Sequence, residues 1–293
     1  MKKTTLAVIG CAFATLCVVT TNAIAQTSDL THYYIGVDNN AEVGFGPYTG
    51  LANPNQNRVT LLFNHLSLTT VENSHYHPIG NYGYTGDVTD PTVVNTNGNN
   101  RLPETYTGLS LELAPAAAGS PYEGMLISGM GAGNAYDDYG DLEIRKNTSI
   151  PGTEGYGPVG EAGTTNLGNA AYYMYTRDTQ DFTVPLDGLS LELELVSATP
   201  GLAVGGADGS VWMDQVGDTY PLFDGAESLT PTFFVDDDAA PGVYSASFQL
   251  NDTSGTYLSS GTFHFDFSVV PEPGSASLTL LAFGGLMLLI RRK

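Results

Sequence analysis

Short runs in which apolar and polar residues alternate recur along the chain, separated by Gly, Pro, Asn and Asp. The clearest runs are 59–63, 109–113, 189–195 and 263–267. Because side chains on a β-strand point alternately to its two faces, such runs predict strands with one buried face. In the last run three Phe residues share one face, and His264 and Asp266 share the other. Long amphipathic helical patterns are absent, so the sequence predicts an all-β, sandwich-like fold.

The turns and gaps between these runs predict two lobes that meet near residue 180. Residues 26–180 form the first β-rich domain, and 181–269 form an immunoglobulin-like β-sandwich. A Pro-Gly-x-Tyr sequence at 241–244 precedes an alternating strand and a hairpin turn, as is common in such modules. The Gly- and Asn-rich stretch 129–168 is a long surface loop or the seam between subdomains. The hexapeptide Gly-Leu-Ser-Leu-Glu-Leu at 108–113 and 188–193 reflects either a duplication or ordinary strand alternation.

The first 25 residues have the organisation of a cleavable signal peptide. Lys2 and Lys3 are followed by an apolar run over 6–19 and by the small-x-small tripeptide at 23–25. This order predicts export and cleavage by signal peptidase before Gln26. The only two cysteines, Cys11 and Cys17, lie inside this segment. The mature protein therefore has no disulfide, no thiol nucleophile and no thiolate metal site.

The opposite end, residues 270–293, combines three features in order: Pro271, Glu272 and Pro273; an apolar run over 275–290; and Arg291, Arg292 and Lys293. The run is shorter than the roughly 20 residues of a spanning helix, and an ordinary membrane anchor is one interpretation. The segment also resembles the PEP-CTERM sorting signal of Gram-negative bacteria, which an exosortase recognises in the membrane. The resemblance implies a protein of the cell envelope or outer surface, or a secreted one, first anchored in the inner membrane by its C-terminal helix.

The net charge of the chain limits the classes of ligand that it could bind. Asp and Glu total 31 against 10 Lys and Arg, and the formal net charge is −21. Nucleic-acid binding depends on a basic surface, so this class of function is excluded. An acidic surface instead keeps a protein soluble and attracts cations.

Histidine is the residue type through which this chain could bind a transition metal. The chain has five: His32, His65, His75, His77 and His264. His75 and His77 are two residues apart, so on a strand both imidazoles would project from one face. His65 ends the preceding strand, and a short connection would place it beside them. We predict zinc ligands in the order His75 and His77, then His65 and His32, with Glu72 or Asp38 able to complete the shell; the alternative is that the pair caps a loop.

A second resemblance bears on zinc. The segments 32–38, 50–55, 73–77 and 99–108, with Ile79-Gly80, are similar to those of a cyanobacterial PEP-CTERM family repressed by the zinc-uptake regulator. The resemblance implies synthesis under zinc limitation and a role in zinc homeostasis. The partners that we predict are exopolysaccharide or a zinc transporter. The resemblance implies no ligand set.

Motifs of common enzymes are absent from the sequence. There is no Gly-x-Ser-x-Gly elbow, His-Glu-x-x-His helix or phosphate-binding Gly-rich loop, so we predict a non-catalytic protein. One alternative is a structural or adhesive matrix protein that contacts exopolysaccharide without a metal, with Trp212 and the tyrosines at 172, 173 and 175 as a sugar-stacking surface. A secreted hydrolase using two carboxylates is the other. The acidic runs 137–138 and 236–238 are calcium sites or solvated turns.

Overall fold

The computed structural model describes residues 33–65, 70–73, 75–95, 100–103, 111–129, 142, 144–146, 182, 186, 188–222 and 228–270. Within these residues the regular elements are β-strands and one short 3-10 turn, η2 (Val71–Asn73). The all-β prediction is thus confirmed. The predicted signal peptide, residues 1–25, and residues 271–293 of the predicted sorting tail lie outside the described residues.

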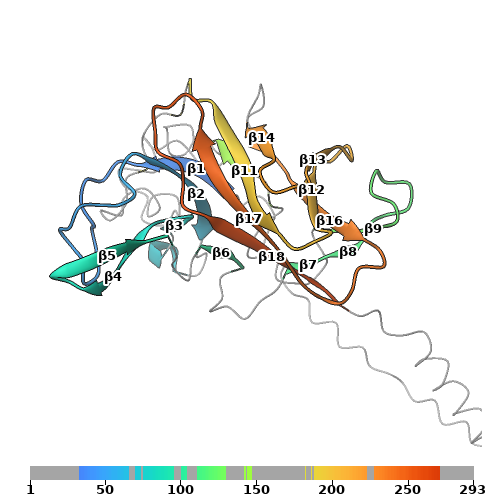
Figure 1. The fold of residues 1–293 in the computed structure, drawn as a ribbon, viewed down its shortest axis with the longest axis horizontal. Coiled ribbons are helices and arrows are strands. Elements are labelled where there is room, and N and C mark those ends of the chain that lie inside the picture. Colours follow the sequence, from blue (N-terminus) through green and yellow to red (C-terminus); the bar gives the residue numbers. More distant parts are fainter. Residues whose placement is uncertain are drawn as a thin grey trace, which may run out of the picture.

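The described strands form three larger sheets and a two-stranded ribbon (Figure 1). The first sheet has the order β15 (Ser228–Leu229), β10 (Ile144–Lys146), β1 (Tyr33–Asp38), β2 (Arg58–His65) and β3 (His75–Ile79). The central sheet has the order β14 (Thr219–Leu222), β11 (Leu191–Ala198), β17 (Gly242–Asp252), β18 (Phe263–Val269) and β6 (Arg101–Leu102), and β7 (Leu111–Glu112) also pairs with β18. The third sheet has the order β13 (Val211–Met213), β12 (Ala203–Gly205), β16 (Thr232–Asp236), β9 (Met125–Ile127) and β8 (Ala114–Pro115). The ribbon consists of β4 (Gly83–Asp87) and β5 (Asp90–Val94).

The hydrophobic core is built from the alternating runs of these strands. In β18 the odd-numbered residues are buried and the even-numbered ones are only partly buried, as the sequence predicts. The same alternation occurs at the start of β11. One buried cluster contains residues of all three larger sheets, among them Ile35, Leu193, Phe265 and Phe233. The sheets therefore share apolar surface, which is the main stabilising contribution in folding.

Aromatic rings fill the centre of this cluster. The Phe233 ring of β16 lies 5.2 Å from Phe265 and 4.6 Å from Phe267, both of β18. The Tyr33 ring of β1 meets the Phe265 ring edge-on at 5.8 Å. Tilted and edge-on arrangements at these distances are favourable for aromatic pairs. The centre of β18 is therefore the point at which the three sheets meet.

Asparagine side chains connect the first and central sheets through the backbone. The Asn100 Oδ1 atom accepts hydrogen bonds from the N–H groups of Gly80 and Asn81, each at 3.0 Å. Its Nδ2 atom donates to the Asn81 carbonyl at 2.9 Å, and the Gly261 N–H donates to the Gly80 carbonyl. A Cβ atom on Gly80 would lie 2.7 Å from the Gly261 oxygen, and Gly80 has a φ of +81°. This close approach therefore requires glycine at position 80.

Strands from before and after residue 180 pair with one another. β10 pairs with β15, β9 with β16, and β6 and β7 with β18. The predicted boundary between a domain at 26–180 and an immunoglobulin-like sandwich at 181–269 stays a prediction. Within the stretch 129–168, the described residues include the strand β10.

Candidate metal centre

The backbone brings three of the predicted zinc ligands to neighbouring positions. β2 ends at His65 and β3 begins at His75, and the two strands run antiparallel. His65 and His75 are direct partners in the register, and His77 is the partner of Phe63. Because alternate residues of a strand share a face, His75 and His77 lie on the same side of β3.

The His75 and His77 rings are close together. Their centroids are 4.6 Å apart and their planes are inclined by 62°. The Nδ1 atom of His75 lies 2.6 Å from the carbonyl oxygen of Asn73. A carbonyl only accepts hydrogen bonds, so Nδ1 carries the proton, and in the neutral ring Nε2 carries the lone pair. Metal-binding histidines are commonly oriented by this kind of bond from the other ring nitrogen.

Buried neighbours fix β3 while its two histidines remain half-buried. Tyr76 is buried on one face, where its ring meets Tyr34 edge-on at 5.9 Å. Ile79 and Phe63 are buried on the other face as part of the central cluster. β3 is also the edge strand of the first sheet. The pair of histidines therefore sits where the buried core reaches the sheet edge, on a strand held by packing.

The remaining predicted ligands have different placements. His32 lies outside the described residues, next to Tyr33, which pairs with Phe63. Glu72 is exposed in η2, the turn that precedes β3. Asp38 was predicted as a possible fourth ligand, and this is wrong. β1 and β2 are antiparallel and Asp38 pairs with Arg58, at the end of β2 opposite to His65. At about 3.3 Å per residue, the length of β2 places Asp38 more than roughly 20 Å from His65.

The described side chains do not by themselves form a complete metal site. Among them, no group of three or more His, Cys, Asp or Glu residues is arranged to hold a metal ion. His75 and His77 provide two nitrogen ligands, whereas a tetrahedral zinc site needs four. His65 and His32 remain the predicted additional ligands. The formal charge of −21 favours the approach of a cation to the protein.

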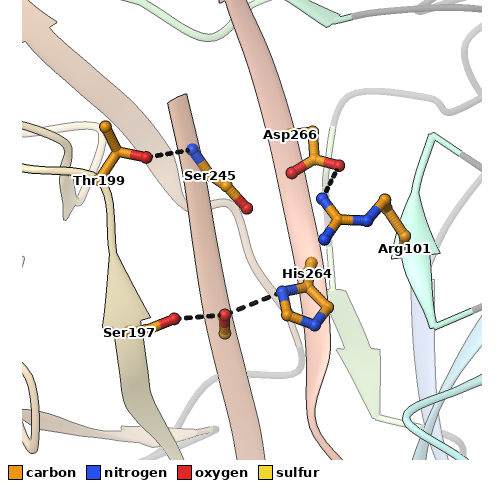
Figure 2. A network of polar contacts seen from close by, with 7 residues as sticks. Arg101, Ser197, Thr199, Ser245, His264 and Asp266 are labelled. Atoms are coloured by element: carbon orange, nitrogen blue, oxygen red, sulfur yellow. Dashed lines mark hydrogen bonds and ion pairs between the residues drawn. The ribbon is translucent and has the colours of Figure 1, made fainter. Parts of the chain in front are cut away.

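The fifth histidine belongs to a polar network on the outer face of the central sheet (Figure 2). His264 Nδ1 lies 2.8 Å from Ser247 Oγ, which lies 2.6 Å from Ser197 Oγ. Arg101 of β6 forms an ion pair with Asp266 of β18. The network thus spans four neighbouring strands: β11, β17, β18 and β6. It connects the short parallel strand β6 to the sheet.

A serine beside a histidine is also the arrangement of a nucleophile and its base. Here Ser247 is only 3% exposed, in the middle of β17, so its hydroxyl is closed to a substrate. Burial lowers the pKa of His264; the positive charge of Arg101 lowers it further, and Asp266 acts in the opposite direction. His264 is therefore favoured in its neutral form, which suits a hydrogen-bonded structural role.

A pocket in the loops beside the first sheet was not predicted from the sequence. We call it the loop pocket; it has a volume of about 280 Å³ and is lined by Asp38, Glu42, Val43, Gly44, Phe45, Gly46, Pro47, Tyr48, Asn53, Pro54, Asn55, Pro78, Asn81, Tyr82, Gly83 and Tyr84. Its aromatic residues stand among glycines and prolines at 44–48 and 82–84. This cluster of residues, together with Asn53-Pro54-Asn55, is the sequence feature from which a pocket could have been predicted.

Two other predicted surfaces are partly described. The Trp212 ring stacks on Tyr220, with centroids 4.0 Å apart and an angle of 16°, so one face of the indole is covered. The tyrosines at 172, 173 and 175 lie outside the described residues, as does the acidic run 137–138. The acidic run 236–238 is exposed at the end of β16. Neither Trp212 nor this turn defines a site in the described part of the chain.

Comparison with protein-family models, with curated proteins and with solved structures finds no match for this chain. No helix within the described ranges has the length and apolar character needed to cross a membrane.

Proposed function

We propose that this chain is an exported, non-catalytic protein of the cell envelope or surface that binds zinc and serves zinc homeostasis when zinc is scarce. His75 and His77 are its first ligands, and His65 and His32 complete the site. Signal peptidase and an exosortase process the chain, and a zinc transporter is the candidate partner. The targeting segments at 1–25 and 270–293 support the location.

The observation that carries the proposal is the pairing of β2 with β3. It places His65 opposite His75, with the His77 ring 4.6 Å from the His75 ring. The hydrogen bond of His75 to the Asn73 carbonyl adds support, because it selects the tautomer in which Nε2 can bind a metal. A pair of histidines that only capped a loop would not need a third histidine position beside it.

Zinc titration by calorimetry of the purified full chain, stripped with a chelator, tests the proposal. We expect saturable binding of about one zinc per chain, and loss of this binding in the His75→Ala/His77→Ala double variant. The His264→Gln variant is the matched control, because it removes a histidine from the polar network alone. Its zinc binding should equal that of the natural chain.

Two results would count against a zinc protein. One is the absence of saturable binding, and the other is binding that the double variant leaves unchanged. Either result would favour a structural or adhesive protein. In that case zinc would regulate the synthesis of the protein but would not bind to it. A measurement at several pH values adds a check, since protons compete with zinc for histidine nitrogens and binding should weaken as the pH falls.

A further inference from the structure

The loop pocket combines acidic with aromatic side chains. The residues that line it include Asp38, Glu42, Phe45, Tyr48, Tyr82 and Tyr84. Among the described residues, its lining contains no Lys, Arg or His. A pocket whose charged side chains are all acidic concentrates cations, and aromatic ring faces also attract positive charge. The lining therefore favours a positively charged ligand over a neutral or a negative one.

Two tyrosines hold the walls of the pocket together in the absence of a ligand. The β1–β2 connection and the ribbon of β4 and β5 lie together at one end of the described structure (Figure 1). The Tyr48 hydroxyl of the connection donates to the Gly86 carbonyl of the ribbon at 2.9 Å, and the Tyr84 hydroxyl of the ribbon donates to the Ala52 carbonyl of the connection at 2.8 Å. The two rings are 5.5 Å apart with their planes tilted by 40°. Because the rings are fixed in advance, a ligand pays little entropy to order them.

Glu42 belongs to the same wall. It forms a β-bridge with Ala52, the residue whose carbonyl accepts the hydrogen bond from Tyr84. The next residue, Val43, donates its N–H to the Leu51 carbonyl at 2.8 Å, so the backbone around Glu42 is held by its own hydrogen bonds. The Glu42 side chain is exposed. Its carboxylate therefore lies on the solvent side of the pocket, near the paired rings.

Asp38 adds a second negative charge from the protein side. It is only 8% exposed, and its carboxylate accepts hydrogen bonds from the Asn40 N–H at 3.0 Å and from Asn53 Nδ2 at 2.8 Å. Both of these donors are neutral amides, so they orient the carboxylate without cancelling its charge. Coulomb attraction acts over several ångströms and needs no free lone pair on the carboxylate. Asp38 therefore favours a cation in the pocket without having to contact it.

The aromatic lining favours an organic cation over a metal ion. Calcium takes roughly six to eight oxygen ligands, whereas no group of three or more His, Cys, Asp or Glu residues in the described ranges is arranged to hold a metal. An ammonium group is instead attracted to the faces of aromatic rings within about 6 Å. Besides the two paired tyrosines, Phe45 offers a third ring and is 64% exposed.

Tyr82, the fourth aromatic residue of the lining, already has a cationic neighbour. The Arg58 guanidinium carbon lies 4.3 Å from the centroid of the Tyr82 ring. Arg58 is not a lining residue, and it donates hydrogen bonds to the carbonyls of Pro54 and Ser259. Its positive charge disfavours a second cation at Tyr82. The place for a cation is therefore beside Phe45, Tyr48 and Tyr84.

We propose that the loop pocket binds the ammonium group of a small organic cation. The positive charge lies against the rings of Phe45, Tyr48 and Tyr84, and the two carboxylates attract it. The volume of about 280 Å³ is at the small end of ligand pockets, which run from roughly 300 to 1,000 Å³, so the cation is compact. Anions are repelled by the carboxylates and by the formal charge of −21. The inference goes beyond zinc binding and does not depend on it, because the two sites use different residues.

Saturation-transfer NMR and calorimetry on the zinc-free full chain test this inference. The cationic probes are choline and putrescine. Neohexyl alcohol, the uncharged isostere of choline in which carbon replaces nitrogen, separates the effect of charge from that of shape, and maltotetraose represents neutral sugars. We expect saturable binding of at least one of the cations, with a Kd of about 0.1–10 mM, and binding of neohexyl alcohol at least about fivefold weaker than that of choline. The affinity for the cation should fall as NaCl is raised from about 0.01 to 0.5 M, because salt screens the carboxylates.

Substitutions locate the bound cation. Glu42→Gln removes a charge and Phe45→Ala removes a ring, and each should lower the affinity about two- to fivefold. Asp237→Asn is the matched control for charge, since Asp237 is exposed and is not a lining residue. Val216→Ala is the control for an exposed apolar side chain, because Val216 is 68% exposed and lies outside the lining. Both controls should leave the affinity unchanged.

Four outcomes would overturn the inference. One is that neither cation binds saturably at about 10 mM. Another is that neohexyl alcohol binds as tightly as choline, which would mean that the pocket recognises shape and not charge. Tighter binding of maltotetraose than of both cations would assign the pocket to a sugar. Cation binding that neither Glu42→Gln nor Phe45→Ala weakens would place the cation elsewhere on the acidic surface. Far-UV circular dichroism of each variant separates loss of binding from loss of the fold.

Discussion

Replacing Phe265 with Ala should destabilise the whole β fold, because its ring is shared by three sheets. Phe265 lies in the middle of β18 and is 2% exposed. Its ring centroid is 5.8 Å from that of Tyr33 in the first sheet and 5.2 Å from that of Phe233 in the third sheet. Within the central sheet it is 6.1 Å from Phe248.

The size of the effect follows from the cavity that the ring leaves. Truncation of a buried Phe to Ala costs about 3–5 kcal/mol, and more when the surroundings cannot collapse into the space. Here the walls of the cavity belong to three sheets, each held by its own ladder of hydrogen bonds, so collapse is restricted. We expect a loss near the upper end of that range, with a fall in Tm of roughly 10–15 °C for a chain of this size.

Urea unfolding, followed by far-UV circular dichroism and by the fluorescence of Trp212, measures the loss. Trp212 is in β13 of the third sheet, so its signal reports on a different sheet from the substituted residue. The two signals should shift together, with an unchanged m-value. The matched control is Phe45→Ala, an exposed Phe whose removal should change the free energy of unfolding by less than about 0.5 kcal/mol.

Two results would refute this reasoning. One is a loss below about 1 kcal/mol, which would mean that the ring contributes no more than an average position. The other is a biphasic curve in which the variant shifts only one phase. That curve would show that the predicted lobes 26–180 and 181–269 unfold separately and do not depend on a shared core.

Gly80→Ala should destabilise the fold by about 1–3 kcal/mol more than Gly50→Ala. Both glycines have a positive φ, but only a Cβ atom at position 80 would meet the Gly261 oxygen. Equal losses in calorimetric unfolding would show that this contact relaxes. His264→Gln should flatten the dependence of stability on pH just below pH 6.5. Because burial lowers the folded pKa of His264, the unfolded chain binds the proton first and stability falls as the pH drops; an unchanged slope in urea titrations would assign this dependence to other groups. Burial disfavours the charge of Asp252, but hydroxyl and N–H donors of its turn outweigh burial and lower its pKa. Asp252→Ala should therefore cost about 1–3 kcal/mol at pH 7, with the difference fading below about pH 4; a constant difference down to pH 2 would contradict this account.

The long strands could be predicted because their signal is local. β11, β17 and β18 each contain an alternating run that shows which face is buried. The prediction of one buried face is wrong for β2, because all residues of 59–63 are buried and both faces of this strand are covered. The short strands β6, β7, β10 and β15 contain two or three residues each, too few for any period. They are strands because a remote segment supplies their hydrogen-bond partners, as when β6 aligns parallel to β18. Such pairing depends on the whole fold and leaves no local pattern.

The same distinction holds for the candidate sites. The shared face of His75 and His77 follows from their spacing, and the approach of His65 from the short connection between two strands. Asp38 was misassigned because the sequence does not show the direction of β1 relative to β2. The two strands are antiparallel, so Asp38 lies at the end of β2 opposite to His65. The loop pocket was missed because two connections that are distant in sequence form it together: the β1–β2 connection, with Tyr48 and Asn53, and the β3–β4 connection, with Tyr82.

The position of β18 has a consequence for how the protein is made. This strand follows every other described strand in the sequence, yet it lies inside the central sheet, between β17 and the short strands β6 and β7. Until it leaves the ribosome, the eleven-residue strand β17 has an open edge, and Phe233 and Phe248 lack their main aromatic neighbour. Open edges of this length pair readily with other chains. The nascent chain therefore cannot complete its fold progressively during translation, and it must be kept from other copies until its last strand is available.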